Sequence, residues 1–345
     1  MRTRIIATIG PACARVPLLV RMIREGVSVF RFNFSHGTMA EHERTLARVR
    51  QAQRQTGRHV EILQDLAGHR IRTGALRRHR PVILKPGQRF TFYRELVPGG
   101  GSGVSLDYHG SFLQIRAGQR IFIADGTIAL RVIRSREHRL ETVVLQGGGL
   151  GERKGVNIPA ARLEFPPISL KDLDDLNFAI QHRLDFVGQS FVRTAGDVEA
   201  VKRRLAITLP HAKVIAKIED REGVQNFAAI LRTAHGIMVA RGDLGISIPI
   251  HEIPIVQKWM IAACNHVKKP VITATQMLEH MIEHREPTRA EVTDVANAVI
   301  DGSNFVMLSG ETATGKHPVE VVKMMRTIIE YTERHAPYKG VRRTR

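Results

Sequence analysis

Ala216-Lys217-Ile218-Glu219-Asp220-Arg221-Glu222-Gly223 is followed further along the chain by Val239-Ala240-Arg241-Gly242-Asp243-Leu244-Gly245. Each stretch is an apolar, strand-like run that ends abruptly in charged residues. The first places a lysine and a carboxylate two residues apart, so both side chains leave a strand on the same face. The second adds a carboxylate from a Gly-Asp turn. Two carboxylates and a lysine at the ends of neighbouring strands can hold a hard divalent cation beside a fixed positive charge.

Short, apolar, β-branched runs like these recur along the whole chain. Runs that are apolar throughout, and do not alternate with polar residues, are typical of parallel strands buried on both faces. Eight strands are predicted in this way, at Arg4–Ile9, Val29–Phe34, Val60–Leu66, Phe186–Phe191, Val214–Ile218, Ile237–Ala240, Val271–Thr275 and Phe305–Leu308.

Amphipathic helical patterns lie between these runs, for example at Glu41–Gln55 and Gly223–Thr233. Thr288 and Glu291 have the spacing of a capping box that opens another helix. Eight alternating strands and helices predict an α/β fold of the closed (β/α)₈ type, a TIM barrel, rather than an open sheet.

One connection is far longer than an ordinary loop. About 90 residues separate the third strand from the next helix, and they contain short strand-like segments between glycines. We expect a small β-domain inserted after strand 3, on the face where barrel enzymes carry their chemistry, and acting as a lid. The expected organisation is a discontinuous barrel of residues 1–74 and 167–338, an inserted β-barrel lid domain of residues 75–166, and a basic tail of residues 339–345.

The amino-acid composition limits the classes of protein to which this chain can belong. A hydrophobic fraction of 43% in 345 residues suits a globular protein with a full core. No apolar run approaches the ~20 residues needed to cross a bilayer, so no membrane association is expected. Two distant cysteines without a CxxC pair favour a reducing, cytoplasmic location.

The net charge of +19 could mark a nucleic-acid binder, but aromatics are only 5% and do not interleave with the basic residues. A solvated basic surface without specific nucleic-acid binding is therefore the preferred interpretation.

Polar residues follow the predicted strands at one end of the barrel. A single one of them would be an ordinary surface residue. Several carboxylates and a lysine at one barrel mouth indicate an active site instead. The set is Arg31, Asn33, Ser35, Asp65, Lys217, Glu219, Asp243, Thr275 and Glu311.

Longer motifs give the chain a resemblance to a known family. It resembles the pyruvate kinases over nearly its whole length, with the motifs in the family's order and at the family's spacing. They are TIGPA at Thr8–Ala12, RFNFSHG at Arg31–Gly37, GVNIP at Gly155–Pro159, SFVR at Ser190–Arg193, KIED at Lys217–Asp220, VARGDLG at Val239–Gly245, ATQMLE at Ala274–Glu279, PTRAEVTDVANAV at Pro287–Val299 and SGETA at Ser309–Ala313.

The resemblance implies phosphoryl transfer from phosphoenolpyruvate to ADP, giving pyruvate and ATP. It implies Mg²⁺ or Mn²⁺ held by Glu219 and Asp243, with Lys217 stabilising the transferred phosphoryl group. Arg31 and Arg72 would hold phosphate oxygens, and Thr275 would help to protonate the enolate.

The other implied roles are binding roles. The implied substrate-binding residues are Ser190, Arg241, Gly242, Asp243, Thr275 and Glu311. The implied nucleotide-binding residues are His36, Arg72, Asp125, Lys154 and Asn157. The positions that meet the family's monovalent cation, or its substitute, are Asn33, Ser35, Asp65, Leu66 and Arg70.

The loop Asp65–Gly74 departs from the family pattern. Ala67 replaces a polar residue, His69 replaces a proline, and Arg70 stands where the family has Glu or Lys. In the family, Glu at this position accompanies a need for K⁺, and Lys accompanies independence from it. Arg70 with Leu66 resembles the second type, so K⁺ is not expected to be required. Alternatively, the longer guanidinium of Arg70 pairs with Asp65.

The sequence ends a few residues after its last predicted helix, so the C-terminal domain that many family members carry is not expected. Since that domain usually holds the sugar-phosphate effector site, we expect no such activation. A homodimer through the barrel is expected, with a monomer as the alternative. Two other functions stay open: a metal-dependent lyase or decarboxylase acting through a pyruvate enolate, and a non-catalytic homologue that binds nucleic acid.

Overall fold

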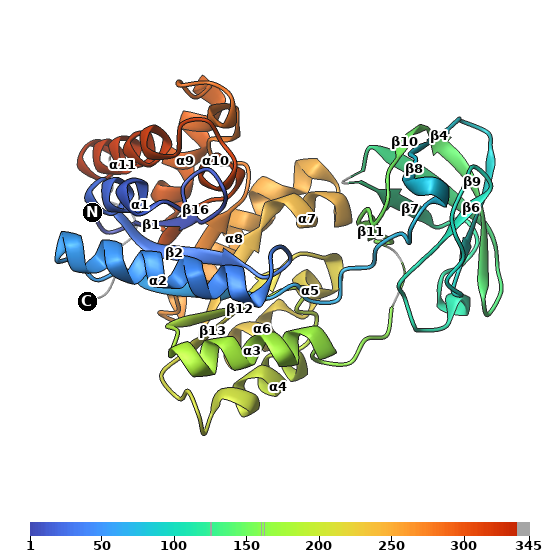
Figure 1. Cartoon of the computed structure of the whole chain (residues 1–345), viewed down its shortest axis with the longest axis horizontal. Coiled ribbons are helices and arrows are strands. Elements are labelled where there is room, and N and C mark those ends of the chain that lie inside the picture. Colours follow the sequence, from blue (N-terminus) through green and yellow to red (C-terminus); the bar gives the residue numbers. More distant parts are fainter. Residues whose placement is uncertain (125, 160, 162, 337–345) are drawn as a thin grey trace. The chain divides into compact units, whose positions relative to one another are not determined.

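Eight short strands pair in parallel and close into a barrel in the computed structural model, which describes residues 1–124, 126–159, 161 and 163–336 (Figure 1). The prediction of a closed (β/α)₈ barrel is confirmed. In order around the barrel the strands are β1 (Arg4–Thr8), β2 (Val27–Asn33), β3 (Glu61–Asp65), β12 (Phe186–Gln189), β13 (Lys213–Ile218), β14 (Gly236–Ala240), β15 (Val271–Ala274) and β16 (Phe305–Leu308).

Side chains from every strand fill the interior of this barrel, so it is a packed core and not a pore. All of them are less than 8% exposed, and β15 and β16 contribute two each. They are Ile6, Val29, Leu63, Phe186, Ile215, Met238, Ile272, Ala274, Phe305 and Met307.

Helices follow the strands and surround the barrel (Figure 1). The predicted capping box of Thr288 and Glu291 is confirmed, and Thr38 and Thr194 open two further helices in the same way. The helices are α1 (Val16–Arg24), α2 (Met39–Thr56), α3 (Leu170–His182), α4 (Ala195–Leu205), α5 (Arg221–Gln225), α6 (Phe227–Thr233), α7 (Arg241–Ser247), α8 (Ile253–His266), α9 (Arg289–Asp301), α10 (Gly310–Ala313) and α11 (Pro318–His335).

One predicted helix, Gly223–Thr233, is two helices in the structure. Asn226, with φ −93° and ψ 8°, ends α5 and begins α6. Its side-chain amide donates to the carbonyl oxygen of Arg193 at 2.9 Å. An asparagine that finds a partner outside the helix competes with helix continuation, and periodicity alone does not reveal this.

The connection after β3 folds into sheets of its own. A six-stranded sheet has the order β11-β7-β8-β9-β5-β6, and a two-stranded sheet pairs β10 with β4. A separate apolar cluster that includes Phe90, Phe92 and Tyr108 forms its core. The strands are β4 (Val82–Leu84), β5 (Arg89–Tyr93), β6 (Gly103–Ser105), β7 (Arg120–Ile123), β8 (Ile128–Ser135), β9 (Arg139–Gln146), β10 (Gly148–Leu150) and β11 (Val156–Asn157).

Internal contacts divide the chain into two compact units. The first unit comprises Met1–Gly68, Leu170–Gly242 and the residues from His251 onward, and it contains the barrel. The second unit comprises His69–Ser169 together with Asp243–Ile250. The second unit therefore takes eight residues from a distant part of the chain, which include most of α7.

The two cysteines behave as small core residues. Cys13 and Cys264 are free and buried, and burial raises the pKa of their thiols to about 11 and about 12. Both thiols are therefore protonated and unreactive near neutral pH.

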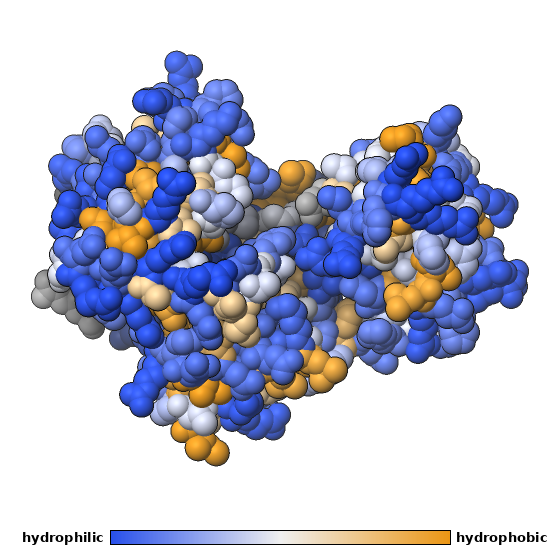
Figure 2. All heavy atoms as spheres, in the orientation of Figure 1, coloured by the Kyte–Doolittle hydropathy of each residue, from blue (hydrophilic) through white to orange (hydrophobic). Residues whose placement is uncertain are grey.

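Hydrophilic residues predominate on the face of the molecule in Figure 2, with hydrophobic residues in small separate patches. Such a surface accords with the large excess of Lys and Arg over Asp and Glu. None of the helices in the described part of the chain is long and apolar enough to cross a membrane.

The barrel core yields a prediction on stability. Ile215, 1% exposed, packs inside the barrel, whereas Ile207 is 91% exposed. We expect Ile215→Ala to lower the free energy of unfolding by about 2–5 kcal/mol, because it leaves a cavity. The matched change Ile207→Ala is expected to alter the free energy of unfolding by less than about 0.5 kcal/mol. Urea unfolding followed by fluorescence of Trp259, the only tryptophan, reports on this unit. Equal effects of the two changes would contradict the packing described.

Candidate active site

The carboxyl-terminal ends of the parallel strands bring the predicted residues of the first unit to one end of the barrel. Arg31 and Asn33 lie on β2, Asp65 is the last residue of β3, and Lys217 lies near the end of β13. Parallel strands in a barrel direct these ends to the same face. The remaining predicted residues of this unit follow directly after strands: Ser35 and His36, Leu66, Ser190, Glu219, Arg241 and Gly242, Thr275, and Glu311.

Lys217 lies at the centre of a buried ion network. Its Nζ is 2.8 Å from Asp65 Oδ1, 3.1 Å from Glu219 Oε1 and 2.5 Å from Ser190 Oγ. The Arg31 Nε donates to the other Asp65 oxygen at 2.6 Å. Two cations thus face two anions, and this balance is what allows four charged groups to leave water.

The network keeps its members charged. Burial by itself would lower the pKa of the Lys217 ammonium, but the Asp65 and Glu219 carboxylates outweigh it and raise the pKa above its usual value. Burial would likewise raise the pKa of Asp65, but Lys217 and Arg31 outweigh it, so this pKa lies below its usual value. A permanent ammonium therefore stands at the barrel end near neutral pH.

Thr275 lies in a strained turn after β15. Thr275 and Gln276 have φ of 67° and 53°, in the left-handed region that a β-branched residue rarely adopts. The guanidinium of Arg241 holds this turn: it donates to the carbonyl oxygens of Thr275 and Gln276 at 2.6 and 3.0 Å and pairs with Asp294 at 2.6 Å. The described contacts of Arg241 therefore support the position of Thr275.

The hydroxyl of Thr275 is itself held in place. Its Oγ1 accepts from the Gly242 N–H at 2.8 Å and donates to the Ala274 carbonyl oxygen at 2.6 Å. Glu311 supports the same region, since its carboxylate, 1% exposed, accepts from the Leu278 and Ser309 N–H groups at 3.1 and 2.6 Å. Glu311 thus binds backbone.

The predicted monovalent-cation positions of the first unit are largely occupied by internal contacts. The Asn33 Oδ1 accepts from the Ser35 N–H at 3.1 Å, and Leu66 is buried. His36, predicted to bind nucleotide, follows Ser35, and its backbone oxygen lies 3.0 Å from Nε2 of His42. The oxygens of Asp65 are taken by Lys217 and Arg31.

The remaining predicted residues belong to the second unit. Nη2 of Arg70 lies 3.5 Å from Asp243 Oδ1, so the described ion pair of Arg70 is with Asp243. Arg72 forms an isolated antiparallel bridge with Gly155, and the Lys154 N–H donates to Thr73 Oγ1. Asn157 follows on β11, so Arg72, Lys154 and Asn157 lie on adjacent segments. Asp125 and the predicted basic tail 339–345 lie outside the described residues.

Two of the predicted site residues are carboxylates, the ligand type that a hard divalent cation prefers. No group of three or more His, Cys, Asp or Glu side chains is placed to hold a metal ion among the residues that the structure describes. Mg²⁺ is usually bound through one or two carboxylates, and water or substrate oxygens complete its shell. Glu219, in the first unit, and Asp243, in the second, are each a carboxylate of that kind. The Glu219 Oε2 already accepts from the Phe191 N–H at 2.6 Å, which fixes its orientation.

Some supporting residues are not evident from the sequence. Asp294 pairs with Arg241, Gly155 lies under the guanidinium of Arg70, and the Asp172 carboxylate accepts from the Ala67 and Gly68 N–H groups at 3.1 and 3.3 Å. Asp294 lies in the motif Pro287–Val299, and this was the only indication in the sequence that Asp294 has a role at the site. Asp172 carried no signal of a role in this loop.

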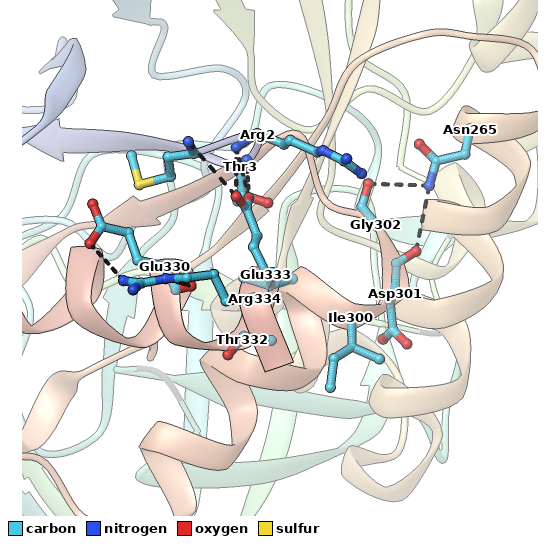
Figure 3. A pocket seen from close by; sticks show the side chains of 12 residues that line it. Arg2, Thr3, Asn265, Ile300, Asp301, Gly302, Glu330, Thr332, Glu333 and Arg334 are labelled. Atoms are coloured by element: carbon cyan, nitrogen blue, oxygen red, sulfur yellow. Dashed lines mark hydrogen bonds and ion pairs between the residues drawn. The ribbon is translucent and has the colours of Figure 1, made fainter. Parts of the chain in front are cut away.

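A pocket of about 710 Å³ lies at the other end of the barrel. Thr3 and Gly302, which precede β1 and β16, line it, as do Glu333 of α11 and Asn265 of α8 (Figure 3). The Glu333 carboxylate accepts from the backbone N–H groups of Arg2 and Thr3, and Asn265 donates to the Gly302 carbonyl oxygen. These contacts join chain segments, and the catalytic candidates of the first unit lie at the opposite strand ends.

This architecture defines a (β/α)₈-barrel protein that gathers fixed charges at the carboxyl-terminal strand ends, where such barrels carry their chemistry. The family model "Pyruvate kinase, barrel domain" matches residues 1–322. The chain belongs to the pyruvate kinase family.

Individual relatives agree with this assignment. The chain is 44% identical to a pyruvate kinase of Geobacillus stearothermophilus, over 99% of this chain and 58% of that protein. It is also 44% identical to a pyruvate kinase of Thermococcus litoralis, over 100% of this chain and 72% of that protein. A crystal structure of a pyruvate kinase from Cryptosporidium parvum superposes with a TM-score of 0.93 at 41% identity, over 98% of this chain and 70% of that one.

The ion network predicts a specific dependence of stability on pH. Because the pKa of Asp65 is lowered on folding, its contribution is present above the unfolded pKa of about 3.9 and is lost as pH falls further. We expect Asp65→Asn to lower the free energy of unfolding by about 3 kcal/mol from pH 5 to pH 9, and by less below about pH 4. Urea titrations at several pH values measure this.

The control is Asp174→Asn on α3, which replaces an exposed carboxylate. The free energy of unfolding of this variant is expected to stay within about 0.5 kcal/mol of that of the parent protein at every pH. A cost of Asp65→Asn that stays constant down to pH 2 would contradict the lowered pKa.

Proposed function

We propose that this chain transfers the phosphoryl group of phosphoenolpyruvate to ADP and yields pyruvate and ATP. The observation that carries the proposal is the Lys217 ammonium, buried yet permanently charged, at the carboxyl-terminal end of a barrel strand. Phosphoryl transfer needs little covalent help from a protein and depends on positioning and on neutralising charge. The relatives named above are pyruvate kinases, and we extend their reaction to this chain.

Each residue of the network has a role in this proposal. Lys217 stabilises negative charge on the transferred group. Arg31 donates from Nε to Asp65 and from Nη1 to Thr8, and it offers phosphate oxygens its Nη2 group. Asp65 holds both cations at 2.6–2.8 Å, so it positions them. Their geometry is set before substrate arrives, so no energy is spent on reorganising them during the reaction.

A divalent cation, Mg²⁺ or Mn²⁺, is proposed to bind at Glu219 and Asp243. When bound, it neutralises negative charge on substrate oxygens. Arg72, Lys154 and Asn157 are proposed to meet the phosphates of the nucleotide, together with His36 and Asp125. Ser190 and Gly242 are proposed to border the three-carbon substrate.

Thr275 is proposed to assist proton delivery to the enolate carbon. The turn that carries it has an unusual backbone conformation, and the Arg241 guanidinium holds it there. Strained backbone that is held in this way is common at active sites. Protonation of the enolate makes the overall reaction favourable.

A homodimer through the barrel is also proposed. On α8, Ile255 is 69% exposed and Trp259 is 46% exposed. Large apolar side chains on one exposed helix are characteristic of interfaces between chains.

The activity test is pyruvate formation from phosphoenolpyruvate and ADP with Mg²⁺. Lys217→Met is expected to lower kcat at least about 100-fold, because it removes a preorganised charge from the reacting group. The matched control Lys258→Met breaks a surface ion pair with Asp301 and should leave kcat within about twofold. Thermal unfolding of both variants separates lost catalysis from lost folding.

Two results would contradict the proposal. Absence of pyruvate formation by the parent protein with Mg²⁺, with or without K⁺, would reject the kinase function. Equal rates for the parent protein and a folded Lys217→Met variant would reject the role of the ammonium.

Independence from K⁺ is proposed on the basis of Arg70, whose guanidinium is always charged. We expect the initial rate to change by less than about twofold when K⁺ is replaced by tetramethylammonium, a difference of about 0.4 kcal/mol. Arg70→Glu is expected to lose activity in tetramethylammonium and to regain it with K⁺. A collapse of the parent rate without K⁺ would contradict this proposal.

A further inference from the structure

Arg70, which departs from the family pattern, is paired with Asp243. The proposed function assigns this carboxylate to a metal ion. Nη2 of Arg70 lies 3.5 Å from Oδ1 of Asp243, and both side chains are about a quarter exposed, at 28% and 24%. Arg70 and Asp243 belong to the same compact unit, although 173 positions (243 − 70) separate them in the sequence.

The guanidinium of Arg70 packs against the backbone of Gly155. A Cβ atom at residue 155 would lie 2.9 Å from Nε and 3.1 Å from Nη2 of Arg70, closer than side chains normally approach. The segment around Gly155 runs beside that of Arg70, since Arg72 bridges to Gly155 and the Val156 N–H donates to the Ile71 carbonyl oxygen at 2.9 Å. The absence of a side chain at residue 155 therefore lets the guanidinium lie against this backbone.

A guanidinium and a divalent cation compete for the same carboxylate. Arginine does not lose its proton at any physiological pH, so deprotonation of the guanidinium cannot release Asp243 to an ion. A cation that binds Asp243 while Arg70 stays in place would also face an adjacent like charge. Either way, Arg70 reduces the affinity of Asp243 for the ion.

We propose that Arg70 is a resident counter-ion of Asp243, which a divalent cation must displace when it binds. The proposal rests on the assignment of Asp243 as a metal ligand. Loading of the ion ends the pair between Arg70 and Asp243, and the guanidinium then turns toward an anionic oxygen of the substrate. Binding of the ion and binding of a phosphate-bearing substrate therefore strengthen each other.

The experiment measures Mn²⁺ binding to the substrate-free protein, from the loss of the electron paramagnetic resonance signal of free Mn²⁺. We expect Arg70→Met to lower the Kd about fivefold, the range for a partly exposed ion pair. Gly155→Ala keeps every charge but displaces the guanidinium, so it should lower the Kd in the same direction.

Two matched variants serve as controls. Gly100→Ala adds a methyl group where nothing lies within 4 Å, and its Kd should equal that of the parent protein. Arg72→Met removes the same charge from a neighbouring residue whose guanidinium donates to the Arg153 carbonyl oxygen, and it should change the Kd by less than Arg70→Met. Circular dichroism verifies that each variant is folded.

An unchanged Kd in Arg70→Met, or an equal decrease in Arg72→Met, overturns the proposal. Failure of the parent protein and of all variants to bind Mn²⁺ overturns it as well, since Asp243 is then not a cation ligand. Pyruvate formation by the parent protein, measured separately with Mg²⁺, shows whether the proposed function survives that result.

Discussion

The buried ion network around Lys217 constrains both the fold and the candidate site. Lys217, Arg31, Asp65 and Glu219 carry two charges of each sign. A single buried charge without its partner would cost several kcal/mol, whereas the balanced set satisfies its members mutually. The partners come from β2, β3 and β13, or directly after β13, so they meet only when the barrel closes. Closing the barrel and assembling the charges are therefore one event.

The turn that carries Thr275 depends on a second set of contacts. Arg241 follows β14, Asp294 lies on α9 and Glu311 lies on α10, yet all three support the residues just after β15. The left-handed conformation of Thr275 persists because these partners hold it. The barrel therefore fixes the position of the Thr275 hydroxyl with polar side chains that bind the backbone of this turn or each other.

The sequence predicted the barrel because its strands are short apolar runs, and the eight runs correspond to β1, β2, β3 and β12–β16. Capping at Thr288 was predictable because its signal is local. The break at Asn226, the clamp by Arg241 and the pairing of Arg70 with Asp243 could not be predicted. Each depends on a partner brought close by tertiary folding, and residue type at one position does not specify that partner. The motifs include the residues of the first unit that lie at the carboxyl-terminal strand ends, but they do not indicate which of these residues bind backbone.

The second unit is not a single continuous piece of sequence. Between Gly68 and His251 the chain passes from one unit to the other four times, and α7 begins in the first unit and continues into the second. A recombinant fragment cut at residues 69 and 169 would therefore omit Asp243–Ile250, which packs with it. The insertion could be removed from this protein, or grafted onto another barrel, only together with the stretch Asp243–Ile250.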